Sequence, residues 1–291
     1  MPGEKSARRR GVLLVLFATV LWSMAGLFAR LVAHLDVWTV LGWRALLGSA
    51  SICVLGLVQW RRGRLDEPFA FGWLSPLVAL LAMVAISAYA ASVMTTTIAD
   101  VMIIYATLPF VAAAIGFLVN REKVTPRTLV ASGAALAGIA IMVASGLGSG
   151  RLLGQALSGL MTLSFAGMVV LQRRQPGASM FAVNAIGALG SGFFGLLNSP
   201  HPPLDLYDMG VLFVFGLTTI GLAFLLFMEG AKFIPSAEAG LISLLDVVLG
   251  PFWVFLAFGE NPGAATILGG AIVLAAALWR TASDLVREKV F

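Results

Sequence analysis

The chain has 291 residues, of which 59% are hydrophobic and only 11% are charged, whereas ordinary soluble domains carry about 25% charged residues. This composition excludes a soluble globular protein. The net charge of +5 does not indicate nucleic-acid binding, because the basic residues lie at the ends of apolar segments rather than in one patch. We therefore expect a protein whose main partner is the lipid bilayer.

Ten apolar segments follow one another along the chain, separated by charged residues, Gly and Pro. Each is close to the roughly 20 residues that a membrane span requires. The first follows the basic sequence KSARRR, and we interpret it as a spanning helix because no small-residue cleavage site separates it from the next apolar run. The predicted spans are residues 11–33, 38–59, 72–94, 98–119, 126–146, 151–171, 180–198, 208–230, 236–258 and 263–281.

The positions of Lys and Arg predict the orientation of these spans. With the N-terminus in the cytoplasm, sixteen of the nineteen basic residues fall in cytoplasmic segments and only Arg151 falls on the opposite side. The remaining two, Arg30 and Arg44, lie inside the first two spans. Because short cytoplasmic loops are enriched in Lys and Arg, we expect a multi-pass protein of the cell inner membrane with both termini in the cytoplasm.

The second half of the sequence repeats the first. From the third span onward the chain aligns with itself at a shift of 138 residues, which places Asp100 on Glu238, Phe117 on Phe255, Glu122 on Glu260 and Thr128 on Thr266. We predict one repeat over residues 1–147 and a second over residues 148–291. Because five spans is an odd number, the second copy enters the membrane from the other side. The expected fold is all-α, with ten transmembrane helices in two inverted repeats, as in many secondary transporters.

Several short motifs sit at matching places in this pattern: Leu21-Trp22-Ser23, Trp43-Arg44, Leu108-Pro109, and the glutamates Glu122 and Glu260 that close spans four and nine. Together with the repeat, they make the chain resemble the drug/metabolite transporter superfamily, in its ten-helix branch. The resemblance implies a secondary transporter and is greatest to bacterial amino-acid exporters, including those of aromatic amino acids. Two features depart from the family: span seven lacks an arginine, and Asp246-Val247 stands where an acidic residue is usually followed by Pro.

Two prolines predict where a cavity lies. Proline inside a helix removes an amide donor, so Pro109 should free the carbonyl of Tyr105 and Pro251 that of Val247. A freed carbonyl in lipid needs a partner, which a water-filled cavity supplies. We therefore expect spans four and nine to line the substrate site; the alternative is a simple kink satisfied by neighbouring helices.

Two charged residues lie deep within spans. Asp246 is ten residues into span nine, about 15 Å deep at 1.5 Å per residue, and it could bind an ammonium group or a proton. Arg44 lies roughly 10 Å inside span two and could attract a carboxylate. For both, structural pairing or snorkelling is the alternative. Charges nearer helix ends are left out of the site because snorkelling and helix dipoles explain them; these are Arg30, Asp100, Glu122, Glu238 and Glu260.

Aromatic side chains complete the predicted substrate site. Rings facing a cavity offer stacking surface, and a phenol hydroxyl adds orientation. We choose Trp22, Tyr89, Tyr105 and Phe227 because they lie in spans that should meet between the repeats. The alternative is that these rings face lipid or pack within the bundle.

The leading functional hypothesis is a secondary exporter of amino acids that works by alternating access, with proton coupling left open. A multidrug exporter of the same fold is the alternative. An intramembrane enzyme would need a polar catalytic cluster, yet the sequence has two histidines and no HExxH or GxSxG motif. With a single cysteine, Cys53, thiolate metal sites are excluded, so we predict no catalytic residues, metal or cofactor. Since both repeats share one chain, we expect a monomer.

Overall fold

The protein is a bundle of helices. The computed structural model describes residues 2–63, 70–121, 126–146, 150–172, 174–175, 177–231, 233–234, 239 and 242–288. Its helices are α1 (Pro2–Ser23), α2 (Ala25–Leu31), α3 (Val37–Arg61), α4 (Ser75–Thr95), α5 (Ile98–Tyr105), α6 (Leu108–Asn120), α7 (Pro126–Gly146), α8 (Leu152–Gln172), α9 (Met180–Asn198), α10 (Leu206–Gly216), the π-helical segment η1 (Leu217–Leu222), α11 (Ala223–Ala231), α13 (Leu245–Phe258) and α14 (Ala264–Glu288). The all-α prediction is confirmed.

The ten predicted spans all correspond to helical segments. Seven stretches of at least 18 residues are apolar enough to cross a membrane, and three shorter apolar helices account for the others, Leu129–Ile141, Leu245–Phe258 and Ala264–Trp279. Among the described residues, span one consists of α1 and α2 and span four of α5 and α6, while span eight is a continuous helix that passes through the π-helical segment η1 between α10 and α11. The beginning of predicted span nine falls partly outside the described residues.

Polar caps explain where several helices begin. The Asp36 carboxylate accepts the backbone N–H groups of Trp38 and Thr39, at 2.9 and 3.0 Å, and so starts α3. Thr97 caps α5 through the N–H of Asp100. Such side-chain oxygens satisfy donors that the first turn of a helix leaves free. The chain therefore turns sharply between spans without leaving these amide donors unpaired.

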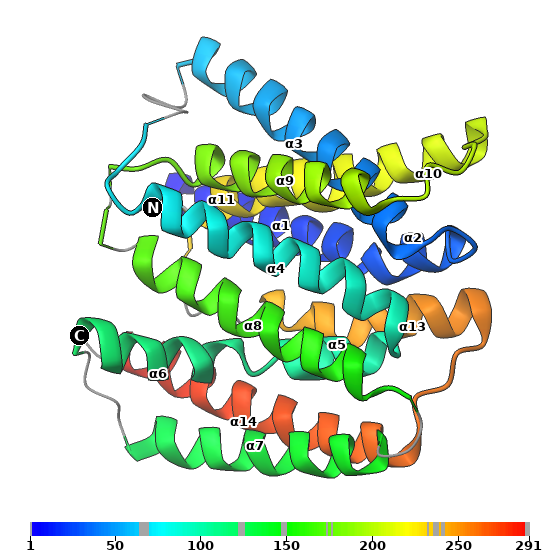
Figure 1. The fold of residues 1–291 in the computed structure, drawn as a ribbon. Helices are drawn as coiled ribbons and strands as arrows, with labels where there is room; N and C mark the ends of the chain where they lie inside the picture. The colour runs from blue at the N-terminus through cyan, green and yellow to red at the C-terminus, as the bar shows by residue number, and fades with distance from the viewer. Residues whose placement is uncertain are drawn as a thin grey trace.

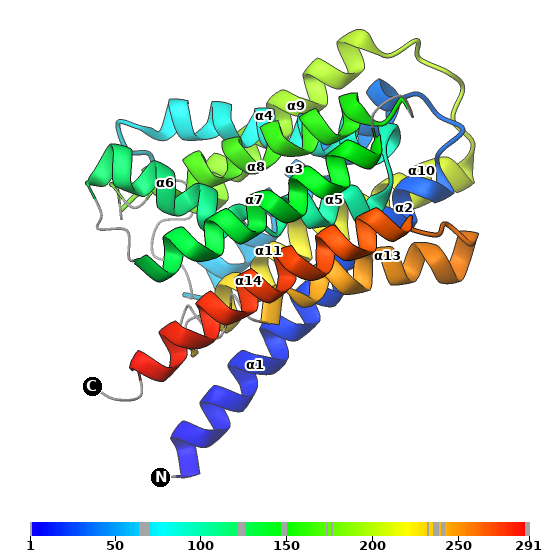
Figure 2. The ribbon, with the colours of Figure 1, turned by 90° about the horizontal axis from the view of Figure 1, so that it is seen from below.

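Both chain termini lie at one end of the bundle, where α1 begins and α14 finishes (Figures 1 and 2). We call this the terminal end, and the opposite end, which holds the α4–α5 turn and the start of α14, the distal end. The first helix of the second repeat, α8, runs antiparallel to α1 (Figure 1). This is the inversion that an odd number of spans per repeat requires.

The contacts between helices follow the repeat. Spans two and seven pack together as α3 on α9, and spans five and ten as α7 on α14. The contact of α4 with α8 joins spans three and six, and the equivalent contact in the other repeat is that of α11 with α1, which joins spans eight and one. The contact of α6 with α8 joins spans four and six, and its equivalent is that of α13 with α1, which joins spans nine and one. Each of these interfaces joins a helix of one repeat to a helix of the other. The two repeats are therefore interlocked rather than side by side.

Small residues allow α9 to approach its neighbours closely, as its four-residue spacing of Gly187, Ser191 and Gly195 predicts. A Cβ added at Gly195 would lie 2.5 Å from the backbone nitrogen of Gly42 in α3. Nothing stands within 4 Å of a Cβ added at Gly159 in α8. The helix pair α3–α9 thus packs backbone against backbone at Gly195.

Replacing Gly195 by valine should therefore destabilise the bundle, because backbone atoms cannot move aside as a side chain would. We expect a loss of about 1–3 kcal/mol, the usual cost of overpacking, seen as a lower midpoint of thermal unfolding in detergent. Gly159→Val is the matched control and should leave the midpoint nearly unchanged. Equal midpoints for the two variants would contradict close packing at Gly195.

The largest cluster of buried apolar residues lies toward the distal end. It joins α2, α5, α10 and α13, the distal segments of spans one, four, eight and nine, and it includes Phe28, Val101, Phe215 and Val254. All four side chains are 9% exposed or less. One continuous apolar core therefore joins these four helices, and it extends to Ala135 of α7 and Val273 of α14.

Candidate functional site

A buried arginine lies near the middle of the bundle. Arg44 of α3 is 5% exposed, and its guanidinium carbon lies 4.4 Å from the centre of the Phe215 ring and 5.3 Å from that of Tyr89. Its Nη2 is 3.5 Å from the Thr219 hydroxyl, whereas Nε and Nη1 have no hydrogen-bond partner among the described residues. Aromatic faces attract a cation but do not satisfy its N–H donors. Arg44 therefore has two donors available to an anion.

The predicted carboxylate lies in the same region. Asp246, the second residue of α13, is 8% exposed, and its Oδ1 atom has no hydrogen-bond partner among the described residues. Its position in the first turn of α13 is favourable because the helix dipole places partial positive charge there. No ion pair joins Asp246 to Arg44 within the described residues. The carboxylate can therefore accept a cationic group.

The two predicted tyrosines connect these charges. Tyr89 of α4 packs against Arg44, whose guanidinium carbon lies 5.3 Å from the ring centre, and Tyr89 and Tyr105, at the end of α5, both lie near Asp246. Tyr105 also packs edge-on against the Phe165 ring, with 6.2 Å between ring centres. Four of the seven predicted site residues thus form one cluster, contributed by α3, α4, α5 and α13. Because α13 belongs to the second repeat, the cluster lies between the repeats.

Trp22 and Phe227 lie beside this cluster rather than within it. Their ring centres are 5.3 Å apart, and the Trp22 indole N–H donates to the Thr219 carbonyl over 2.9 Å. Thr219 belongs to η1, and its hydroxyl faces Arg44. Single π-helical turns are rare and often occur at functional sites. Thr219 therefore links the Trp22 side of the site to Arg44, a connection that the sequence did not predict.

Pro109 stands at the start of a helix rather than in the middle of one. Helix α5 ends at Tyr105, and Pro109 is the second residue of α6, where proline is well tolerated. Pro251 lies inside α13, which continues through it. The break in span four is thus complete, whereas Pro251 does not interrupt its helix.

Span nine is interrupted at the equivalent place. Leu244 forms a turn before α13, and the shift of 138 residues places Leu244 on Ala106, which lies between α5 and α6. Asp246 and Pro109 therefore both stand at the start of a half-helix. Paired discontinuous helices near the middle of a bundle are typical of transporter substrate sites.

A cavity of about 430 Å³ lies between α6 and α7 and is lined mainly by apolar side chains. Its lining includes Thr107 and Phe110 of span four and Ala135 of α7. Leu118 and Leu129, which also line it, are 76% and 62% exposed, so the space opens on the outer face of the bundle. No residue of α13 is in that lining. The part of span four on the terminal side of the break, α6, is therefore separated by this space from α7, which forms span five.

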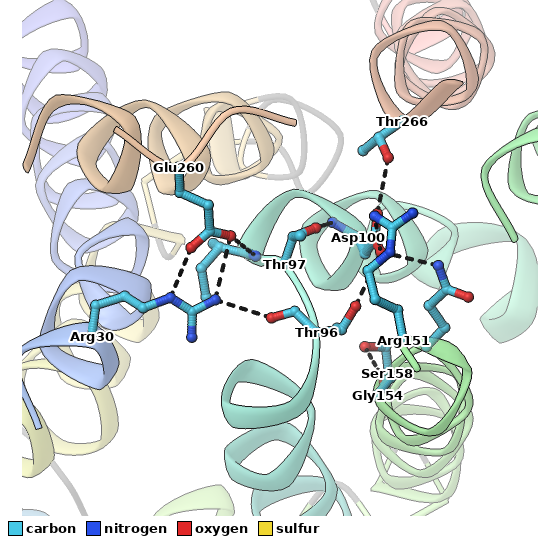
Figure 3. Close-up of polar contacts among 11 residues, drawn as sticks. Arg30, Thr96, Thr97, Asp100, Arg151, Gly154, Ser158, Glu260 and Thr266 are labelled. Carbon is cyan, nitrogen blue, oxygen red and sulfur yellow. Dashed lines mark hydrogen bonds and ion pairs between the residues drawn. The ribbon is translucent and has the colours of Figure 1, made fainter. Parts of the chain in front are cut away.

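Three of the five charged residues near helix ends, Arg30, Asp100 and Glu260, contact other helices. Arg30 pairs with Glu260 at 2.8 Å, and Asp100, which is fully buried, lies 3.4 Å from Arg151 (Figure 3). Glu122 and Glu238, the other two carboxylates set aside, lie outside the described residues. Snorkelling therefore does not explain Arg30, Asp100 and Glu260, which point into the bundle at its distal end.

Comparison with known proteins supports this architecture. The sequence pattern described as the EamA-like transporter family matches the chain twice, over residues 9–144 and 152–281. Sixteen chains of solved structures match the fold; one, described only as the crystal structure of a protein, has a TM-score of 0.66, is 18% identical, and matches over 96% of this chain and 97% of its own. No curated protein matches the sequence. At such low identity the solved structure supports the fold alone.

Proposed function

Because the chain belongs to the EamA-like transporter family of the drug/metabolite transporter superfamily, and is thus a membrane transporter of small substrates rather than an enzyme, we propose that it exports amino acids. Aromatic amino acids are among the proposed substrates. Export takes place across the bacterial inner membrane by alternating access. The unit of transport is one chain, whose repeats extend over residues 1–147 and 148–291.

One observation carries the choice of substrate. Arg44 and Asp246 are buried in one cluster, and each keeps polar atoms without a partner among the described residues. Burying a charge is costly unless it is paired, and these two charges do not pair with each other in the described structure. An amino acid satisfies both, with its carboxylate at Arg44 and its ammonium at Asp246. Tyr89, Tyr105, Trp22 and Phe227 supply rings for an aromatic side chain.

Charge and packing support export as the direction of transport. The excess of Lys and Arg at the terminal end favours a cytoplasmic location for that end. Buried apolar residues of α2, α5, α10 and α13 pack together toward the distal end, whereas the cavity between α6 and α7 lies on the terminal side of the break in span four. Substrate therefore enters from the cytoplasm and leaves at the distal end. Because the repeats interlock, the moving units are groups of helices drawn from both repeats rather than the two sequence halves.

Reconstitution into liposomes tests this function. We expect saturable uptake of labelled aromatic amino acids, and competition by other unlabelled amino acids. The alternative function, export of drugs, predicts competition by lipophilic cations instead; the unpaired Arg44 disfavours such cations by like-charge repulsion. Absence of amino-acid transport, with uptake of a lipophilic cation, would replace the proposed substrate class by the alternative.

A further inference from the structure

Two carboxylates hold the turn between α4 and α5 at the distal end (Figure 3). The first is Glu260, which follows α13. It accepts the Arg30 Nε–H over 2.8 Å and the backbone N–H of Ile98 over 3.2 Å. Arg30 also donates to the carbonyls of Val93 and Thr96, at 2.7 and 3.0 Å. Spans one, three, four and nine therefore meet at this ion pair.

The second carboxylate is Asp100, whose side chain is 0% exposed. Its Oδ2 accepts the Thr96 hydroxyl and the Gln155 amide, both at 3.0 Å, and lies 3.4 Å from Arg151. Its Oδ1 accepts the Thr266 hydroxyl over 3.1 Å. These partners come from the α4–α5 turn, from the start of α8 and from α14. Asp100 thus connects spans four, six and ten.

Thr96 joins the two carboxylates into one network, because its carbonyl accepts from Arg30 and its hydroxyl donates to Asp100 (Figure 3). We propose that this network, built on Glu260 and Asp100, is a latch that keeps the distal end closed and breaks when that end opens. Every span that it joins ends at the distal face. The proposal rests on the alternating access proposed above.

The chemistry of the network suits a reversible contact better than a permanent one. Replacing buried ion pairs by well-packed apolar residues is often neutral or stabilising, so a polar network is a poor means of adding stability alone. Satisfied polar networks do select one arrangement. When water enters an opening distal end, the separated charges are rehydrated, whereas separated apolar side chains would be exposed. Charged groups therefore lower the cost of opening while they specify the closed arrangement.

Cysteine accessibility in lipid nanodiscs tests the latch without any substrate. Cys53, the single native cysteine, is first replaced by serine. Val101, which is 0% exposed in α5 beside the network, is then replaced by cysteine as the reporter of distal opening. Introducing Asp100→Asn or Glu260→Gln should raise the rate of labelling by a water-soluble maleimide about tenfold, since each removes charge-assisted hydrogen bonds.

Three controls distinguish opening of the latch from loss of the fold. Leu206→Cys, at a position 91% exposed, reports reagent reactivity, and Ser191→Cys, at a position 0% exposed in α9, reports general loosening. Asp208→Asn removes another distal carboxylate, which lies 3.1 Å from His34, and should leave labelling at position 101 unchanged. Labelling at position 101 that changes less than twofold in both variants, or that rises in parallel at position 191, overturns the latch. Failure of amino-acid transport alone would leave this result intact and refute only the substrate.

Discussion

Arg44→Gln is expected to reduce amino-acid transport strongly while leaving the fold intact. Two guanidinium nitrogens, Nε and Nη1, have no hydrogen-bond partner among the described residues, and glutamine retains neither the charge nor the fork geometry that matches a carboxylate. Losing one side of a buried charged contact typically costs about 2–5 kcal/mol. Because each 1.4 kcal/mol is tenfold, transport efficiency should fall by roughly 30-fold to more than 1,000-fold.

The substrate itself provides the sharpest control for this variant. An amino-acid amide lacks the carboxylate, so the native protein should discriminate strongly against it, and Arg44→Gln should lose most of that discrimination. Arg61→Gln changes an exposed arginine at the other end of the same helix, α3, and should transport normally. Equal loss of transport for the amino acid and its amide would show that Arg44 supports the structure rather than the carboxylate.

The ten spans were predictable because span length and apolar composition are local properties of the sequence. Interruptions within spans were less so. Pro109 marked the break in span four, but nothing comparable marks the turn at Met24 between α1 and α2. Thr219, in the π-helical segment, contacts Trp22 and Arg44, which lie 197 and 175 residues away in the sequence. Such tertiary contacts leave no periodic signal in the sequence.

The site was predicted in part for the same reason. A charge deep in an apolar span is conspicuous, and the prediction selected Arg44 and Asp246 on that basis. Phe215 and Thr219 were missed because phenylalanine and threonine are common in membrane helices and nothing local marks these two. The functional role of the seven predicted residues remains a prediction that the variants proposed for Arg44 and Asp246 address.

The distal network is not predictable from depth along a helix. Position near a helix end predicts snorkelling for Arg30, Asp100 and Glu260, but depth does not say which way a side chain points. Asp100 is only three residues into α5, yet it is fully buried by α8 and α14. Opposite charges at the same membrane face, such as Arg30 and Glu260, were the available signal.

Asp246→Asn is expected to remove recognition of the substrate ammonium. Asparagine preserves size and one carbonyl acceptor but removes the negative charge that compensates a buried cation. The same range of about 2–5 kcal/mol applies, so transport efficiency should fall at least roughly 30-fold. Asp208→Asn, which neutralises the distal carboxylate beside His34, is the matched control and should transport at the native rate.

Two measurements then separate ammonium binding from proton coupling at Asp246. If the carboxylate binds ammonium, an N-acetylated amino acid, which lacks the cation, should be a poor substrate of the native protein and should lose little further in Asp246→Asn. If the carboxylate also carries a proton, an imposed pH gradient should accelerate native transport, and the variant should lose this response. Retained native rates for the amino acid in Asp246→Asn would contradict both roles. Arg44 and Asp246 are proposed to bind opposite ends of one substrate. If Arg44→Gln no longer discriminates against the amino-acid amide, and Asp246→Asn no longer discriminates against the N-acetylated amino acid, the two results together define the orientation of the amino acid in the site.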